Sequence, residues 1–229
     1  EFDLKTRATG ANAGAADILE VFSIYGRISS ASQELSRALI RFPTTLISAD
    51  RTAGTIPLSG NVNFYLKLYN AQHSETTPVE YKLNVAAVNQ EWEEGVGLDL
   101  VGYKDRNLGQ IGSDWVQRKK GANWSSVGGV YNENDDYLYT QHFSSGLEDL
   151  EVNITPLVER WLAGDQTNYG VGIRLSSSYE ASASQTYAGS DSNVIQNSDG
   201  ARDSYYTKRF FARGTQYFFK RPVIEARWD

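Results

Sequence analysis

The sequence predicts an all-β protein, a jelly-roll-like antiparallel β-sandwich with one short packed α-helix over about residues 154–163. Three observations lead to this expectation: many short runs rich in β-branched and aromatic residues, turn residues between those runs, and one isolated segment with helical spacing. A chain of 229 residues can bury a sizeable core, and β-sandwiches of this length often form one unit. We therefore expect residues 1–229 to form a single domain, in which segments near both ends complete the same two-layered packing.

Strands are expected in several segments that share a high content of β-forming residues. They are residues 35–42, 62–69, 81–88, 169–175 and 223–228. In residues 81–88, Tyr81, Leu83 and Val85 alternate with polar residues, which predicts one buried face. Gly170 and Gly172 indicate a strand that packs closely against a neighbour.

The helix is predicted from its end signals as well as from its apolar face. Thr155 is the expected N-cap, Pro156 stands at the first helical position, and Gly164 supplies the C-terminal stop. A helix this short must pack on a sheet to be stable. The residues expected in the core are Trp161, Leu157, Val158, Trp92, Phe42 and Leu39. Arg37 and Arg41 are expected as charges at the edge or ends of their strand.

Two stretches are typical of long loops. Residues 121–136 are rich in Gly, Asn, Ser and acidic residues, and residues 176–204 are rich in Ser, Ala, Gly, Asn and Asp. Loops of this length within a compact domain are usually functional or mobile.

Five pieces of the chain, in order, resemble the DNRLRE-type carbohydrate-binding-like β-sandwich. They are residues 10–21, 36–42, 85–95, 121–124 and 152–170. The last piece is the most specific, with Val152-Asn153-Ile154-Thr155-Pro156 followed by Trp161-Leu162-Ala163-Gly164 and Asn168-Tyr169-Gly170. The resemblance covers most of the chain and implies the same β-sandwich. Residues 179–221, long and rich in aromatic side chains, depart from it.

The end of the chain, residues 204–228, resembles structural proteins of tailed bacteriophages. This second resemblance implies a virion component that is assembled in the bacterial host cytoplasm and contacts other virion proteins, with a homo-oligomer expected within the assembly. The absence of Met at position 1 agrees with maturation cleavage of a longer chain, and equally with a numbering that starts after the first translated residue.

Composition excludes several classes of function. With a net charge of -6 and a pI of about 5.1, phosphate-backbone binding is not expected as the main role, so no nucleic acid partner is predicted. No cysteine is present, which removes disulfides, thiolate metal sites and cysteine nucleophiles. No run of apolar residues is long enough to cross a membrane, and no secretory leader begins the sequence. Neither a cofactor nor a metal is predicted.

Each candidate catalytic group in the sequence also has a structural interpretation. The densest carboxylate cluster is Glu91, Glu93, Glu94 and Asp99, but glycoside hydrolysis needs two carboxylates on opposite sides of the scissile bond, and one strand cannot supply both. The oxygen-rich run Asn132, Asn134, Asp135 and Asp136 lacks the spacing of an EF-hand calcium loop. The favoured interpretation of the carboxylate cluster is a solvated turn, and that of the oxygen-rich run is a solvated loop.

The two histidines, His73 and His142, lie in no motif and are expected to be structural. His142 could nominally form a triad with Ser125 or Ser126 and Asp149, but no Gly-x-Ser-x-Gly turn supports it. We therefore expect no enzymatic activity.

Aromatic residues in polar surroundings are the candidate contact residues, either for a glycan, by stacking on pyranose rings, or for a protein partner. The candidates are Tyr131, Tyr137, Tyr139, Tyr179, Tyr187, Tyr205, Tyr206, Arg209 and Arg213. The predicted function is a non-enzymatic structural subunit of a tailed-phage virion, in the neck, tail, fibre or capsid decoration. The alternative is a glycan-binding module of a secreted or tail-associated protein, and a glycan depolymerase using Glu91 or Glu93 with Asp99 is a third hypothesis.

Overall fold

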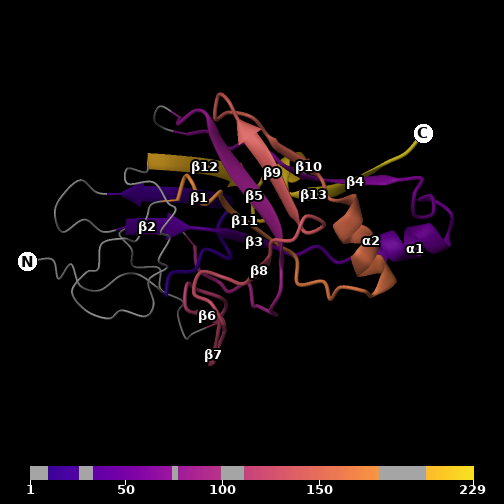
Figure 1. Cartoon of the computed structure of the whole chain (residues 1–229), viewed down its shortest axis with the longest axis horizontal. Coiled ribbons are helices and arrows are strands. Elements are labelled where there is room, and N and C mark those ends of the chain that lie inside the picture. Colours follow the sequence, from indigo (N-terminus) through magenta and orange to yellow (C-terminus); the bar gives the residue numbers. More distant parts are fainter. Residues whose placement is uncertain (1–9, 26–32, 74–76, 99–110, 181–204) are drawn as a thin grey trace, which may run out of the picture.

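A computed structural model describes residues 10–25, 33–73, 77–98, 111–180 and 205–229 of the chain (Figure 1). Within these ranges every strand pairing is antiparallel. The predicted fold class, an all-β sandwich, is confirmed. In Figure 1 the strands β5 and β9 cross obliquely over the horizontal strands of the other layer.

The first layer joins the two ends of the chain. Its strands are β1 (Ile18–Tyr25), β2 (Gln33–Ser36), β4 (Asn63–Leu68), β10 (Leu150–Asn153), β12 (Tyr205–Phe211) and β13 (Val223–Arg227). They form two sheets with the orders β12-β1-β2 and β10-β4-β13. A bridge between Asn70 and Phe210 connects these sheets just after β4. Segments near both ends of the chain therefore take part in the same two-layered packing, as expected, and β1 pairs directly with β12.

The second layer is centred on two largely buried strands, β5 (Tyr81–Val88) and β11 (Val171–Leu175). Its other strands are β3 (Ala38–Ile40), β8 (Tyr131–Asn132) and β9 (Leu138–Phe143). β3 lies beside β11, and both β8 and β9 pair with the far side of β5. A small hairpin, β6 (Gln117–Lys119) with β7 (Ala122–Asn123), stands apart at the bottom of Figure 1.

The main core lies between the layers and follows the period of two that strands impose. In β4, Phe64, Leu66 and Leu68 are fully buried and alternate with more exposed residues. From the second layer, Tyr81 stacks on Phe143 with ring centroids 5.3 Å apart. The alternation seen in the sequence therefore places the core face correctly.

The predicted helix is present as α2 (Thr155–Ala163), and Leu157, Val158 and Trp161 are buried as expected. Gly164 ends it in the left-handed conformation, with φ of 82°. The N-cap prediction is wrong by one residue: Ile154 is the N-cap, and Thr155 instead accepts the Phe64 backbone N–H (2.8 Å) through its hydroxyl. The Thr155 hydroxyl thereby connects the start of α2 to β4.

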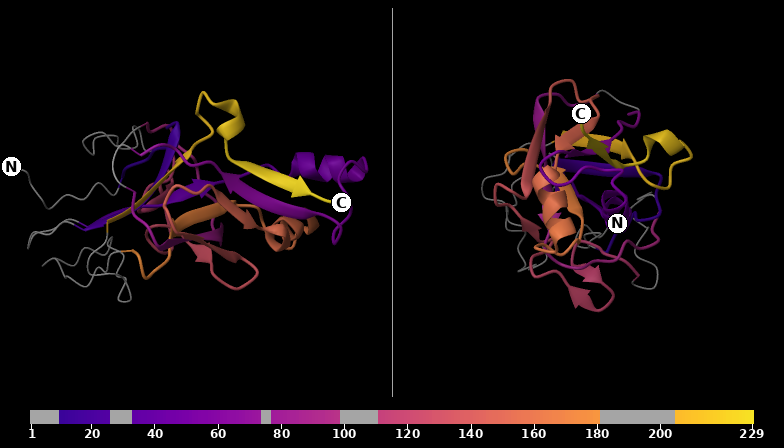
Figure 2. Two further views of the ribbon diagram at one scale, coloured as in Figure 1. Left: turned by 90° about the horizontal axis from the view of Figure 1, so that it is seen from above. Right: turned by 90° about the vertical axis from the view of Figure 1, so that its right-hand side faces the viewer.

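A second helix, α1 (Thr45–Thr52), was not expected from the sequence. It has no buried residue, so it lacks the apolar stripe that would reveal it. Arg51 holds it to α2 through a bidentate ion pair with Glu159 (2.7 and 2.8 Å). Both helices lie at the same end of the sandwich in Figures 1 and 2.

The strand predicted over residues 35–42 is divided between the two layers. β2 belongs to the first layer and β3 to the second, and Arg37 is the residue between them. Arg37 is not an edge charge, because its side chain is only 8% exposed and makes a bidentate bond to Glu180, which is 4% exposed. Its guanidinium also lies over the rings of Trp115 and Tyr131. A buried ion pair thus marks the crossing point.

A smaller core covers the outer face of the second layer. It is formed by Val88, Trp92 and Trp124, with partly buried neighbours that include Leu39 and Tyr131. Trp92 is buried as predicted, whereas Leu39 and Phe42 are only half-buried, because they pack at the margins of the two cores.

The glycine prediction for β11 is confirmed. A Cβ on Gly172 would lie less than 3.0 Å from the Tyr131 ring, and a Cβ on Gly170 would meet the Ile40 carbonyl and Arg41. Gly170 also has a φ of 81°, which disfavours other residues.

Candidate functional site

The connection between β12 and β13 projects from the sandwich for a reason that lies in the strand register. Phe210 lies opposite Asn70, and Val223 lies opposite Lys67. Between these two pairs the β4 segment advances by three residues (70 − 67), whereas the segment from β12 to β13 advances by thirteen (223 − 210). The surplus residues cannot remain in the sheet, so they leave it. Figure 2 shows this yellow segment standing out from the body in both views.

At the outer end of this segment is the aromatic tip, which we define as Tyr217, Phe218 and Phe219. Their exposed fractions are 53%, 67% and 88%. Phe218 begins the 3₁₀ turn η3 (Phe218–Lys220), and its ring lies edge-on to that of Phe219 with centroids 5.5 Å apart. Large apolar side chains this exposed and this close together are unusual on a monomer surface.

The aromatic tip is held in a defined conformation at its base. Thr215 is buried, and its carbonyl accepts a hydrogen bond from Arg221 Nη2 (3.2 Å). The Thr215 hydroxyl accepts the Tyr217 N–H (3.3 Å), and the Arg221 guanidinium lies 5.2 Å from the centroid of the Phe218 ring. The tip is therefore a presented surface with its own internal contacts.

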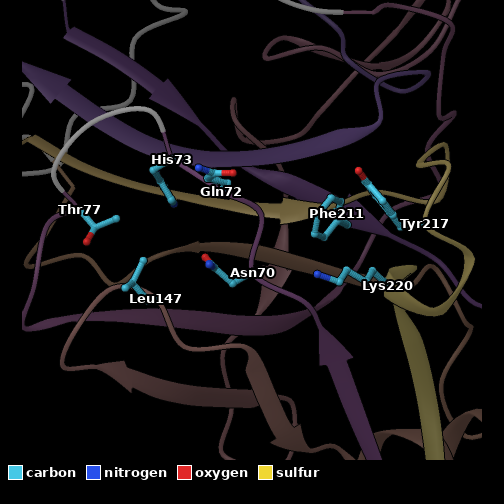
Figure 3. A pocket seen from close by; sticks show the side chains of 8 residues that line it. All are labelled: Asn70, Gln72, His73, Thr77, Leu147, Phe211, Tyr217 and Lys220. Atoms are coloured by element: carbon cyan, nitrogen blue, oxygen red, sulfur yellow. The ribbon is translucent and has the colours of Figure 1, made fainter.

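Beside the aromatic tip lies an open groove of about 690 Å³ (Figure 3). It is lined by Asn70, Gln72, His73, Thr77, Leu147, Phe211, Tyr217 and Lys220. These residues come from the segment after β4, the approach to β5, the turn between β9 and β10, the end of β12, and the aromatic tip together with Lys220, which follows it. In Figure 3 the aromatic side chains lie at one end, His73, Thr77 and Leu147 lie at the other, and the Lys220 side chain points inward toward Asn70.

A buried lysine holds the strands next to this groove. The Lys208 ammonium donates to Asn70 Oδ1 (2.7 Å) and to the carbonyls of Gly146 (2.9 Å) and Glu148 (2.7 Å). It also lies over the Phe143 and Phe210 rings at 5.0 and 5.1 Å. Burial lowers the pKa of Lys208 to about 8, although the nearby carboxylates oppose this shift. The lysine thereby joins β12 to the turn between β9 and β10.

The carboxylate of Glu148 organises the same turn. Its Oε1 accepts the Ser144 N–H (2.9 Å), the Ser144 hydroxyl (2.9 Å) and the Ser145 N–H (2.7 Å). Burial alone would raise the pKa of Glu148, but the backbone amides and serine hydroxyls that bond it lower the pKa to about 2.

Glu148→Gln is therefore expected to remove a pH-dependent part of the stability. Because the folded-state pKa lies below the unfolded value, the contribution is present above about pH 4.5 and is lost as the pH falls toward 2. Above pH 5 the free energy of unfolding of the variant should be about 1 kcal/mol lower than that of the wild type. Urea unfolding at pH 6, 4 and 2.5 measures this difference, which should shrink at each step.

Glu93→Gln removes the same charge from an exposed position and controls for net charge. A difference between Glu148→Gln and the wild type that stays constant down to pH 2.5 would contradict the assignment.

The structure places the predicted tyrosines Tyr131, Tyr137 and Tyr139 in half-buried positions. The guanidinium groups of Arg37 and Arg174 lie 5.7 and 5.5 Å from the centroid of the Tyr131 ring. The Tyr131 hydroxyl donates to the Gly128 carbonyl, and the Tyr139 hydroxyl donates to the Asp136 carbonyl. These rings contribute mainly to packing within the chain.

The remaining predicted contact residues lie mostly near the start of β12. Tyr205 is 66% exposed and stacks on Tyr206 with centroids 5.0 Å apart, and Tyr206 packs against Tyr179. Arg209 pairs with Glu20 (2.7 Å) on β1.

Arg213, with a side chain 72% exposed, forms a bidentate pair with Glu94. Tyr187 lies outside the described residues. The structure therefore brings Tyr205, Tyr206 and Tyr179 together and leaves Arg213 apart from them.

Three of the candidate acidic residues, Glu91, Glu94 and Asp136, form separate ion pairs. Glu91 pairs with Lys119 (2.5 Å), and Glu94 pairs with Arg213. Asp99 lies outside the described residues. In the other acidic run, Asp136 pairs with Arg160 (2.5 Å). Within the described ranges no group of three or more His, Asp or Glu side chains could hold a metal ion.

The two histidines have different surroundings. His142 is exposed and pairs with Glu80 (3.0 Å), while Asp149, its nominal triad partner, accepts the Asn70 N–H (2.7 Å). His73 lines the groove, and burial, followed by the charges of Lys208 and Arg209, lowers its pKa. Its Nε2 is buried and has no hydrogen-bond partner in the part of the chain that the structure describes.

Sequence reasoning did not select the aromatic tip or the groove as a site. The tip lies within the aromatic ending noted above, and the signal that could have found it is three consecutive aromatic residues between a glycine and a proline. The groove residues near Asn70 carry no motif. Only their position directly after a buried strand could have drawn attention to them.

No protein-family model matches the chain, and no significantly similar curated protein or solved structure was found. The resemblances to the DNRLRE-type domain and to tailed-phage proteins therefore stay predictions. Neither helix in the described ranges is long and apolar enough to span a membrane.

Proposed function

We propose that this chain is a non-enzymatic structural subunit of a larger particle and that it binds neighbouring subunits through the aromatic tip. The exposed side chains of Phe218 and Phe219, held on a projecting segment, carry this proposal. Aromatic residues and arginine are enriched in the cores of protein interfaces, and both are found in the tip and its base. The particle we propose is a tailed-phage virion, because the end of the sequence resembles such proteins.

The energetics favour a covered tip in the assembled state. Removing a phenylalanine side chain from water is worth about 1.5–3 kcal/mol, and the tip offers two that are mostly exposed. The conformation is already fixed by Thr215 and Arg221, so little ordering is needed on binding. A neighbouring subunit with an apolar depression would gain most of this energy.

The test is the incorporation of a double variant, Phe218→Ser with Phe219→Ser, into particles. The intact chain is expressed in the cells that make the particle, and copies per particle are counted by quantitative mass spectrometry. We expect at least about tenfold fewer copies, because a loss of about 1.4 kcal/mol at each contact already lowers the binding constant tenfold.

A matched control replaces two leucines that are equally exposed elsewhere, Leu46→Ser with Leu58→Ser, at exposed fractions of 70% and 71%. This variant should be incorporated like the wild type. Thermal unfolding of both purified variants verifies that each is folded. If purified particles lack the wild-type chain, or contain the phenylalanine variant at the wild-type level, the proposal is wrong.

A further inference from the structure

The groove beside the aromatic tip has the size of a small-molecule site, with a lining that is more polar than is usual. Ligand sites are commonly about 300–1,000 Å³, with apolar walls and a few polar groups. At 690 Å³ the groove lies within this range. Its lining residues come from segments distant in the sequence, so the fold and not a local turn creates it.

One end of the groove offers an aromatic platform. The Tyr217 side chain is 53% exposed, and its ring lies edge-on to Phe211 with centroids 5.5 Å apart. The face of an aromatic ring is negative and attracts the C–H groups of a sugar ring. The Lys220 ammonium lies 5.0 Å from the centroid of the Phe211 ring, so Phe211 already has a cationic neighbour and Tyr217 is the ring left open to a ligand.

The middle of the groove offers hydrogen-bonding groups. Asn70 Oδ1 accepts the Lys208 ammonium (2.7 Å), which orients the amide and leaves its NH₂ group as a donor. The exposed Gln72 amide can both donate and accept. His73 completes this wall with a neutral imidazole. Neutral groups that both donate and accept are suited to hydroxyls.

The groove is also locally cationic within an acidic protein. None of its eight lining residues is acidic, and Lys220 points into it in Figure 3. Lys208 and Arg209 lie close enough to act on His73. Two carboxylates, Asp149 and Glu148, lie near Lys208, but neither lines the groove: Asp149 accepts the Asn70 N–H and Glu148 accepts the Ser144 and Ser145 N–H groups of its own turn. Lys220 is therefore the charged side chain that a ligand in the groove would meet. A ligand with a negative charge is therefore favoured over a neutral one.

We infer that this groove binds a short acidic oligosaccharide, with one sugar ring stacked on Tyr217, hydroxyls bonded by Asn70 and Gln72, and a carboxylate paired with Lys220. Tyr217 belongs both to the aromatic tip and to this groove, but the particle experiment changes only Phe218 and Phe219, which do not line the groove. The test of this inference uses the purified chain alone, so either result leaves the particle experiment unaffected.

The experiment is an NMR titration of the intact chain with a trimer of galacturonic acid and, in parallel, with a trimer of galactose. The chain has only two histidines, so their ring C–H signals are resolved. His73 lines the groove, and His142, exposed on β9 and paired with Glu80, is an internal reference. The acidic trimer should shift the His73 signals alone, with a dissociation constant on the order of 1 mM that weakens as salt is added.

Variants separate the parts of the site. Lys220→Met should weaken binding of the acidic trimer about fivefold and abolish its salt dependence, while leaving the neutral trimer unchanged. Tyr217→Ala should weaken both trimers. Lys120→Met, which removes the same charge from an exposed position on the β6–β7 turn, should change neither.

Three outcomes would overturn the inference. The first is the absence of a His73 shift with either trimer, and the second is equal affinity for both. The third is complete displacement of the acidic trimer by an equal concentration of inorganic phosphate, which would mean that the groove selects charge alone.

Discussion

Glu180→Ala is expected to lower the free energy of unfolding by about 3–5 kcal/mol, because it leaves the Arg37 guanidinium buried without its counter-charge. The two side chains are 8% and 4% exposed and share bonds of 3.0 and 2.7 Å. Arg37 also donates to the Gly128 carbonyl (3.1 Å), so it cannot leave for water without breaking a further contact. Guanidinium chloride unfolding, followed by tryptophan fluorescence, measures the loss.

A double variant tests whether charge, and not packing, causes this loss. Arg37→Met combined with Glu180→Met removes both charges and keeps apolar volume, so it should be more stable than Glu180→Ala. Arg213→Met is the matched control, because it breaks a bidentate pair whose arginine is 72% exposed and should cost less than about 1 kcal/mol. Equal losses for Glu180→Ala and Arg213→Met would contradict the prediction.

Gly172→Val is expected to destabilise the fold by about 3 kcal/mol, through overpacking in a strand that is covered on both faces. Even the first added carbon would come within 3.0 Å of the Tyr131 ring, which is held by the bond from its hydroxyl to the Gly128 carbonyl and has two guanidinium groups close to it. All five residues of β11 are buried, so the strand has no exposed side toward which to shift. Thermal unfolding monitored by circular dichroism would record a lower midpoint.

The same prediction implies a measurable coupling. When Tyr131→Ala is present, the added carbons of Gly172→Val enter the vacated space, so the two changes together should cost at least about 1 kcal/mol less than their sum. Gly10→Ala serves as the control, since a Cβ there meets only Asp114 at 3.9 Å. Strictly additive losses would show that the Tyr131 ring is not what excludes a side chain from this position.

Periodic features of the fold were predictable from the sequence, and features that depend on long-range partners were not. The alternation in residues 81–88 gives the bounds of β5, and the Pro156 and Gly164 signals delimit α2 to within a residue. By contrast, α1 has no buried residue and is held by Arg51 bonding to Glu159, a contact across 108 positions that no local pattern reveals.

The candidate site illustrates the same limit. The aromatic ending of the chain suggested a contact surface, but the tyrosines selected from polar stretches, such as Tyr131 and Tyr139, have their hydroxyls bonded within the chain. Exposure depends on which layer covers a residue, and that information is absent from its neighbours in sequence. The groove combines His73 with Leu147 and Lys220, which meet only in the folded chain.

By itself the sequence determined the class of fold, because burying alternate residues of many short strands requires two facing layers. It also determined the helix α2 and the need for glycine at Gly172 in β11 and at Gly170 just before it. Tertiary structure alone decided that the chain changes layers at Arg37 and that the segment between β12 and β13 projects from the sheet. The reason is that both depend on register between distant strands, which fixes how many residues can stay paired and how many must project into solvent.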